Sequence, residues 1–324
     1  MADYKGIKGF KVQYLSADPS NPIVGQIWYN DTSKTLKFTE FQAASWATGG
    51  NMATARYGHG GCGTQTAGLA FVGTTYPGPL VANTEEYNGS SWTSGGSAPT
   101  ALRYVGSAGI QTAALLMAGN TGTAFTNASS EYDGSTWTGG GNLAVGSDSG
   151  RGFGIQTAAV AFGGEAPSES PNRPIATEEY NGTSWAAGGN VSWGTVHASS
   201  AGILTAGLKV GGENAPTSGT EEYDGTSWAA GGSLNNGRAG MAGFGLQNSA
   251  GTAGGYLGGY YTGVETYDGT SWSTDVSIST GRTLSQGGGT LTAAVIFGGS
   301  TGSLSAATEE YTGAGPVTKT ITVS

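Results

Sequence analysis

One eight-residue phrase, Glu-Glu-Tyr-Asn/Asp-Gly-Thr/Ser-Ser-Trp, recurs along the chain and restricts the possible folds more than any other feature. Full or near-full copies occupy residues 85–92, 130–137, 178–185, 221–228 and 265–272. Ser45-Trp46 carries only the Trp half, and residues 309–313 carry only the Tyr half. The repeat Trp residues lie 43 to 48 positions apart, so the chain contains six repeats of about 45 residues, one of them divided between its two ends.

Each repeat also contains two apolar, glycine-rich segments around a Gln-Thr-Ala turn, as in residues 152–164. This pattern predicts four strands per repeat: strands a and b flank that turn, strand c carries the Tyr, and strand d carries the Trp. An Asn-Gly or Asp-Gly pair, whose glycine accepts a positive φ, joins c to d. One such sheet cannot bury both faces, and radial stacking protects its edges. We therefore expect an all-β chain folded as a six-bladed β-propeller.

The half-copies predict how the ring closes. The last repeat has strands a, b and c near the C-terminus, so Ser45-Trp46 should supply its d strand. Residues 26–38 form two apolar runs about a polar turn, which predicts a β-hairpin, and the β-prone residues 317–324 could pair with it. We divide the chain into an N-terminal segment, 1–42, and a propeller, 43–324. A seven-bladed ring is the alternative, if the hairpin and the last strand join Trp46 in a blade.

Arginine and glutamate residues also recur at regular positions in the repeats. Five arginines lie 10 to 14 residues after a repeat Trp, and ten glutamates stand directly before the repeat Tyr residues. We expect these residues to form ion pairs or hydrogen bonds between blades. A ring of arginines that lines the central channel and binds an anion is the alternative. The framework residues are Trp46, Trp92, Trp137, Trp185, Trp228, Trp272, Tyr87, Tyr132, Tyr180, Tyr223, Tyr267, Tyr311, Arg56, Arg103, Arg151, Arg238 and Arg282.

Composition argues against several classes of function. The net charge is -9, and the residues after position 40 carry all of that excess, because residues 1–40 hold five lysines and four acids. An acidic body does not favour nucleic-acid binding. A single cysteine, Cys62, cannot form an intrachain disulfide or a cysteine zinc site. We find no apolar segment that resembles a signal peptide or a membrane span, and expect no membrane insertion.

The double glycine followed by Tyr and then Trp resembles the kelch repeat, which also builds the propeller of galactose oxidase. That resemblance covers about residues 43–311. The resemblance to the oxidase raises the question of copper-binding residues. This chain has only two histidines, His59 and His197, and they lie three repeats apart. Cys62 is expected to be a small buried residue of strand a. Serine and histidine are too sparsely combined for a nucleophilic triad. We expect no enzymatic activity, and no catalytic, cofactor-binding or metal-binding residue.

The connections between strands b and c differ between repeats, whereas the a–b and c–d turns are uniform. Variable loops on a rigid scaffold are where recognition tends to lie. Their aromatic residues are candidates for stacking on sugars or packing on a protein partner. These candidates are Tyr76, Phe125, Tyr256, Tyr260 and Tyr261.

The phrase GQIWYNDTSKTLKF, residues 25–38, resembles an element near the start of structural proteins of tailed bacteriophages, particularly cyanophages. That resemblance implies a virion protein assembled in the host cytoplasm: a tail fibre, a tail or neck appendage, or a capsid decoration. Residues 1–42 would bind other virion proteins, and the loops would bind a host-surface glycan or another subunit. A cellular kelch-like adhesion or scaffold module is the alternative, and a degenerate galactose oxidase-like enzyme is a third reading.

Overall fold

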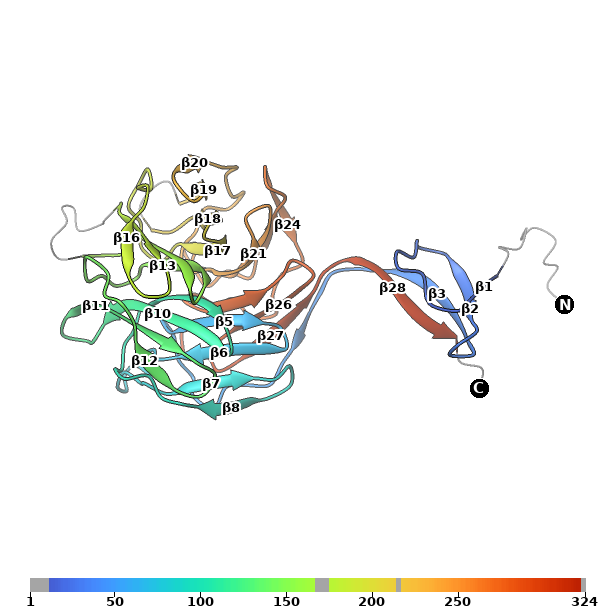
Figure 1. The fold of residues 1–324 in the computed structure, drawn as a ribbon, viewed down its shortest axis with the longest axis horizontal. Coiled ribbons are helices and arrows are strands. Elements are labelled where there is room, and N and C mark those ends of the chain that lie inside the picture. Colours follow the sequence, from blue (N-terminus) through green and yellow to red (C-terminus); the bar gives the residue numbers. More distant parts are fainter. Residues whose placement is uncertain (1–11, 167–174, 214–216, 322–324) are drawn as a thin grey trace. The chain divides into compact units, whose positions relative to one another are not determined.

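The computed structural model describes residues 12–166, 175–213 and 217–321, and every regular element in these ranges is a strand (Figure 1). The chain divides into two compact units, residues 1–45 with 313–324, and residues 46–312. This division differs from the expected one, because the last residues belong with the N-terminal segment and not with the repeats. Among the described residues, no helix exists that could cross a membrane.

The compact unit of residues 46–312 holds the repeats and is called the repeat unit below. It contains six four-stranded sheets, each with its strands in the order a, b, c, d. The first three are β5 (Gly60–Thr64), β6 (Ala67–Phe71), β7 (Thr84–Tyr87) and β8 (Trp92–Gly95); β9 (Gly106–Ile110), β10 (Ala113–Asn120), β11 (Phe125–Tyr132) and β12 (Trp137–Gly139); and β13 (Arg151–Ile155), β14 (Ala158–Phe162), β15 (Thr177–Tyr180) and β16 (Trp185–Ala187). The others are β17 (Ser199–Ile203), β18 (Ala206–Val210), β19 (Thr220–Tyr223) and β20 (Trp228–Ala230); β21 (Ala242–Leu246), β22 (Ser249–Ala253), β23 (Val264–Tyr267) and β24 (Trp272–Asp275); and β25 (Gln286–Gly289), β26 (Ala293–Phe297), β27 (Thr308–Thr312) and β4 (Ser45–Thr48).

The turns within each sheet follow the sequence prediction. Between β7 and β8, Gly89 has a φ of 89°. The Asn88 side chain accepts hydrogen bonds from the backbone nitrogens of Ser90 and Ser91 at 3.0 and 2.9 Å. Tyr87 and Trp92 are therefore cross-strand partners, and their ring centroids are 5.0 Å apart. Asx-type bonding and one left-handed glycine thus set the c–d register.

The fold is a β-propeller, and the a strands of these sheets contact one another in cyclic order from β5 through β9, β13, β17 and β21 to β25 and back to β5. A ring of backbone hydrogen bonds runs along the connections that precede these strands. Six residues with φ between 55° and 70° each donate from the backbone nitrogen to the carbonyl of the next, with N···O distances of 2.5 to 3.3 Å. In bonding order they are Gly58, Leu284, Gly240, His197, Ser149 and Tyr104, which returns to Gly58.

The sheet of β25, β26 and β27 is completed by β4, which confirms the predicted role of Ser45-Trp46. The Trp46 ring lies 5.0 Å from Tyr311, and its Nε1 donates to the carbonyl of Val276 at 3.0 Å. Trp46 therefore lies with β27 and not with the N-terminal hairpin.

The core lies between neighbouring sheets. For example, Phe153 and Phe162 pack with Tyr223 and Trp228 of the next sheet. Close approach here depends on glycine, because a Cβ on Gly207 would lie 1.9 Å from the Phe153 ring. Gly207 of β18 thus makes room for a ring of the adjacent sheet.

The other unit contains one sheet, ordered β1 (Gln13–Leu15), β2 (Ile27–Asn30), β3 (Thr35–Gln42) and β28 (Gly315–Ile321). The predicted hairpin is β2–β3, and β28 pairs with β3 from Gly315↔Gln42 to Ile321↔Leu36, as expected for the last strand. Trp28 is fully buried, and its Nε1 donates to Asp18 at 3.0 Å. The Lys37 ammonium donates to the same carboxylate at 2.6 Å, so one acid ties the preceding segment to both strands of the hairpin.

Candidate functional site

Two separate sets of carboxylate contacts hold the propeller together. The first Glu of the repeat phrase pairs with an arginine of its own repeat: Arg56 with Glu85, Arg238 with Glu265 at 2.5 Å, and Arg282 with Glu309 at 2.6 Å. All six of these side chains are buried. For these three arginines the prediction of contacts between blades was wrong, and so was the channel-ring alternative, because each guanidinium is covered and neutralised within its own repeat. The prediction holds for the second Glu of the phrase and for Arg151, both described below.

The links between sheets come instead from the repeat Tyr residues. Successive residues of a strand face opposite sides, so the second Glu of the phrase faces the neighbouring sheet. There it accepts a hydrogen bond from the Tyr of the next repeat. The fifth repeat lacks this Glu, and Asp275 accepts the bond instead. The six bonds join Tyr87 to Glu310, Tyr132 to Glu86, Tyr180 to Glu131, Tyr223 to Glu179, Tyr267 to Glu222 and Tyr311 to Asp275. Burial raises the pKa of Tyr87 to about 12, so the hydroxyl remains a donor at neutral pH.

Arg103 and Arg151 do not occupy the position of the other three arginines. The residue equivalent to Arg56 directly precedes an isolated β-bridge, and it is Leu102 in the second repeat and Ser147 in the third. Arg103 lies one residue later, with its guanidinium 5.3 Å from the Tyr104 ring. Arg151 lies in β13, and its Nε donates to the carbonyl of Ala198 at 2.7 Å. Spacing from the Trp alone therefore assigned these two residues incorrectly.

The predicted loop aromatics lie in different environments. Tyr256 is 50% and Tyr260 43% exposed, and their rings meet edge to face at 5.8 Å. Tyr261 is half-buried and lies 5.2 Å from the Arg238 guanidinium. Tyr76 is exposed on the loop of another sheet. Phe125 is not a loop residue, because β10 and β11 extend until only residues 121–124 connect them. The structure thus brings together two of the five candidates.

A groove with a volume of about 560 Å³ lies beside Tyr256. Leu257 and Tyr256 form the apolar part of its wall, and Glu213 and His197 form the polar part. A concave surface of this size with an aromatic face and a few polar groups is typical of small-ligand sites. It is therefore the strongest candidate for recognition on the loop face.

Ser149, His197 and Glu213 form a hydrogen-bonded chain that sequence reasoning missed. The Ser149 hydroxyl is 3.0 Å from His197 Nε2, and His197 Nδ1 is 2.9 Å from the Glu213 carboxylate. These residues come from three different connections, so their spacing in the sequence gave no signal. Ser149 is only 5% exposed, and of the three only His197 and Glu213 line the groove. The chain of bonds therefore orients His197 in the groove wall.

His59 and Cys62 are both buried, Cys62 in β5 as expected for a small residue of strand a. Burial, together with the charges of Arg56 and Arg151, holds the pKa of His59 well below its usual range. Burial raises the pKa of the Cys62 thiol to about 12. A neutral imidazole and a protonated thiol fit the interior of a sheet. Across the described ranges, no three His, Cys, Asp or Glu residues gather as a metal site.

The repeats, the four-stranded sheets and their cyclic packing define a β-propeller of the kelch type. The solved structure of YjhT, a kelch-like propeller, resembles this chain with a TM-score of 0.65 and 14% sequence identity, over 83% of this chain and 99% of that one. No protein-family model matches the sequence, and no curated protein matches it. The likeness to YjhT concerns the fold, which hosts unrelated functions.

Proposed function

We propose that this chain is a non-enzymatic structural protein of a tailed-phage virion, in which a rigid propeller binds a host surface or a neighbouring subunit. The observation that carries the proposal is a set of exposed apolar side chains on the unit built around the virion-like phrase. Tyr14, Ile23 and Phe41 are 77%, 70% and 62% exposed. Exposed apolar surface of this kind is typical of interaction sites. The unit of residues 1–45 and 313–324 would therefore contact other virion proteins.

We expect charge on this surface to prevent incorporation into particles. The variant Ile23→Asp/Phe41→Asp should fold normally, because both side chains are exposed, and should fall at least 10-fold in particle-associated protein, because burying two carboxylates in an interface is costly. Quantitative immunoblotting of purified particles measures the amount of particle-associated protein. The matched control is Ile155→Asp on the propeller, which is 51% exposed. Loss of incorporation with the control and not with the double variant would refute the anchor.

The groove beside Tyr256 is where we place glycan binding. The exposed face of Tyr256 can stack on a sugar ring, and the Glu213 carboxylate, which His197 helps to orient, can accept hydrogen bonds from its hydroxyl groups. The groove lies on the same loops that vary between repeats, which supports recognition there rather than at the uniform turns.

Tyr256→Ala should weaken binding to the recognised glycan by at least about 10-fold, since truncating a central aromatic residue of a binding site costs on the order of 2 kcal/mol. A glycan array followed by titration calorimetry measures this. Tyr76→Ala removes an exposed ring from another sheet and should leave the affinity unchanged. Equal losses from both variants, or no glycan retained by the wild-type protein, would contradict this site.

We also infer that the propeller has six blades. Six sheets form the repeat unit, and the backbone ring through Gly58 and Tyr104 returns to its start after six residues. The seventh four-stranded sheet belongs to the other compact unit. These observations support six blades over the seven-bladed alternative.

A further inference from the structure

One position before strand a can be compared across all six repeats. It directly precedes the residue of the isolated β-bridge, and its carbonyl accepts a hydrogen bond from a glycine backbone nitrogen at 2.7 to 3.0 Å. The residues at this position are Arg56, Leu102, Ser147, Thr195, Arg238 and Arg282. The acid position, two residues before the repeat Tyr, carries Glu85, Ser130, Glu178, Glu221, Glu265 and Glu309. The two positions can therefore be read as pairs.

Five of the six pairs are balanced in charge. Three are the buried Arg–Glu pairs described above. In the fourth repeat Thr195 replaces the arginine, and Lys209 of β18 pairs with Glu221 at 2.6 Å instead. In the second repeat both charges are absent, because Leu102 stands opposite Ser130. The third repeat alone keeps the acid, Glu178, and has Ser147 where its cation would be.

Glu178 differs from its counterparts in its surroundings. Glu85, Glu221, Glu265 and Glu309 are at most 2% exposed, whereas Glu178 is half-buried. Its two carboxylate oxygens accept hydrogen bonds from the backbone nitrogen of Ala144 at 2.9 and 3.2 Å. No lysine or arginine of the described chain lies within 4.0 Å of it. Partial burial raises the pKa of this carboxyl.

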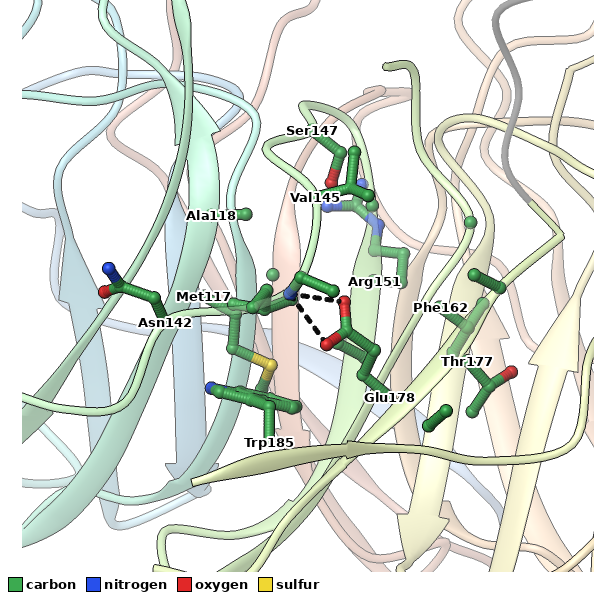
Figure 2. A pocket seen from close by; sticks show the side chains of 18 of the residues that line it. Met117, Ala118, Asn142, Val145, Ser147, Arg151, Phe162, Thr177, Glu178 and Trp185 are labelled. Carbon is green, nitrogen blue, oxygen red and sulfur yellow. Dashed lines mark hydrogen bonds between the residues drawn. The ribbon is translucent and has the colours of Figure 1, made fainter. Parts of the chain in front are cut away.

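A cavity of about 310 Å³ lies where the missing side chain would be (Figure 2). Ser147 and Val145 lie toward one end, Met117 and Trp185 lie toward the other, and Glu178 lies between them (Figure 2). The space beside Ser147, where three of the other repeats place an arginine, is thus open.

The related sites show which chemistry this cavity accepts. In the first repeat the Arg56 guanidinium donates to the carbonyls of Val72 and Asn83, both at 2.9 Å, and to the Glu85 carboxylate. Val72 follows strand b and Asn83 precedes strand c, so their counterparts in the third repeat are Gly163 and Ala176. Both line the cavity. The acceptor residues of a guanidinium site are therefore all present, without the donor.

Arg151 also lines the cavity, but it does not take the place of the missing arginine. Its side chain begins in β13, and its Nε is engaged by the Ala198 carbonyl of the next sheet. Arg151 occupies the position that is Gly60 in the first repeat, where the Arg56 site is already complete. Its charge will oppose a second cation, so the affinity should be moderate.

We propose that the Glu178 cavity binds a guanidinium group supplied from outside the chain, either the side chain of an arginine on a neighbouring protein or a free alkylguanidine. Planar bidentate pairing with the carboxylate, plus carbonyl acceptors, selects guanidinium over ammonium. This inference goes beyond the proposed function, which rests on other surfaces, and each can fail without the other.

Titration calorimetry on the full chain tests the proposal with N-acetyl-arginine methylamide. We expect a dissociation constant on the order of 1 mM or lower, and no heat with the neutral citrulline analogue. Glu178→Gln should weaken binding at least 10-fold, and the matched control Glu165→Gln should not change it. An arginine peptide that binds at least 10-fold tighter than the methylamide would identify a protein source, and equal affinities would identify a free guanidine. Equal heats with arginine and citrulline would overturn the proposal.

Ser147→Arg is the second test, because it restores the residue of the three complete sites. The new guanidinium should fill the cavity, abolish binding of the methylamide and raise the melting temperature by about 2–4 °C, as cavity filling commonly does. If wild-type protein binds nothing but Arg151→Met or Arg173→Ala does, an arginine of the chain already fills the cavity and the proposal is wrong. Arg173 lies outside the described residues.

Discussion

Replacing Glu265 by alanine should lower the free energy of unfolding by about 3–5 kcal/mol, the usual cost of leaving one charge of a buried pair uncompensated. Arg238 donates to that carboxylate at 2.5 Å, and both residues are at most 1% exposed. The remaining guanidinium cannot reach water without opening the sheet. Urea denaturation followed by tryptophan fluorescence measures the loss.

Two variants test whether the loss of stability comes from the uncompensated charge or from the missing carboxylate itself. Arg238→Leu/Glu265→Ser reproduces the neutral pair of the second repeat, and it should recover more than half of the loss, since replacing both partners avoids a buried lone charge. Glu178→Ala removes the same repeat position where no cation is paired, and it should cost less than about 1 kcal/mol. A loss as large as that of Glu265→Ala would show that the carboxylates stabilise chiefly by accepting backbone N–H bonds.

The architecture could be predicted because its determinants are local and repeated. Within the repeats, most strands and turns follow from phrases that occur five or six times, and the half-copy at Trp46 showed how the ring closes. The partners of the arginines could not be predicted, because alternation along a strand tells only that Glu85 and Glu86 face opposite sides. Which side meets an arginine and which meets a Tyr depends on how neighbouring sheets stack.

The candidate sites were less accessible to sequence reasoning for a related reason. Tyr256 and Tyr260 could be selected as loop aromatics, but the groove beside them also needs Glu213 and His197 from other connections. The Glu178 cavity did leave a signal: an acid of the repeat phrase without the usual arginine ten residues after the preceding Trp. Arg151, four residues later, concealed that signal, because spacing alone made it resemble the missing residue.

Trp46→Ala should lower the free energy of unfolding by about 3 kcal/mol, at the lower end of values for losing a packed Trp because this side chain is partly exposed. The variant removes the contact with Tyr311, which holds β4 on the sheet of β25, β26 and β27, and the bond to the carbonyl of Val276, which follows β24 of the neighbouring sheet. That sheet is the only one of the six in the repeat unit, as described, whose strands come from both ends of the sequence. Hydrogen exchange of residues 308–312 should accelerate as well, because β27 loses its outer partner.

Trp92→Ala is the matched control, because Trp92 occupies the same position in a sheet made of one continuous segment. Its ring lies 5.0 Å from Tyr87, and its Nε1 donates to Thr308 at 2.9 Å, so the chemistry removed is closely similar. Equal losses would mean that the joint between the two ends is as strong as the joints within the repeats. If Trp46→Ala costs nothing while Trp92→Ala is destabilising, β4 does not close the ring, and contacts between the first and last repeats, such as the Tyr87–Glu310 bond and the backbone bond from Gly58 to Leu284, must do so. In that case Tyr87→Phe should destabilise the propeller more than Trp46→Ala does.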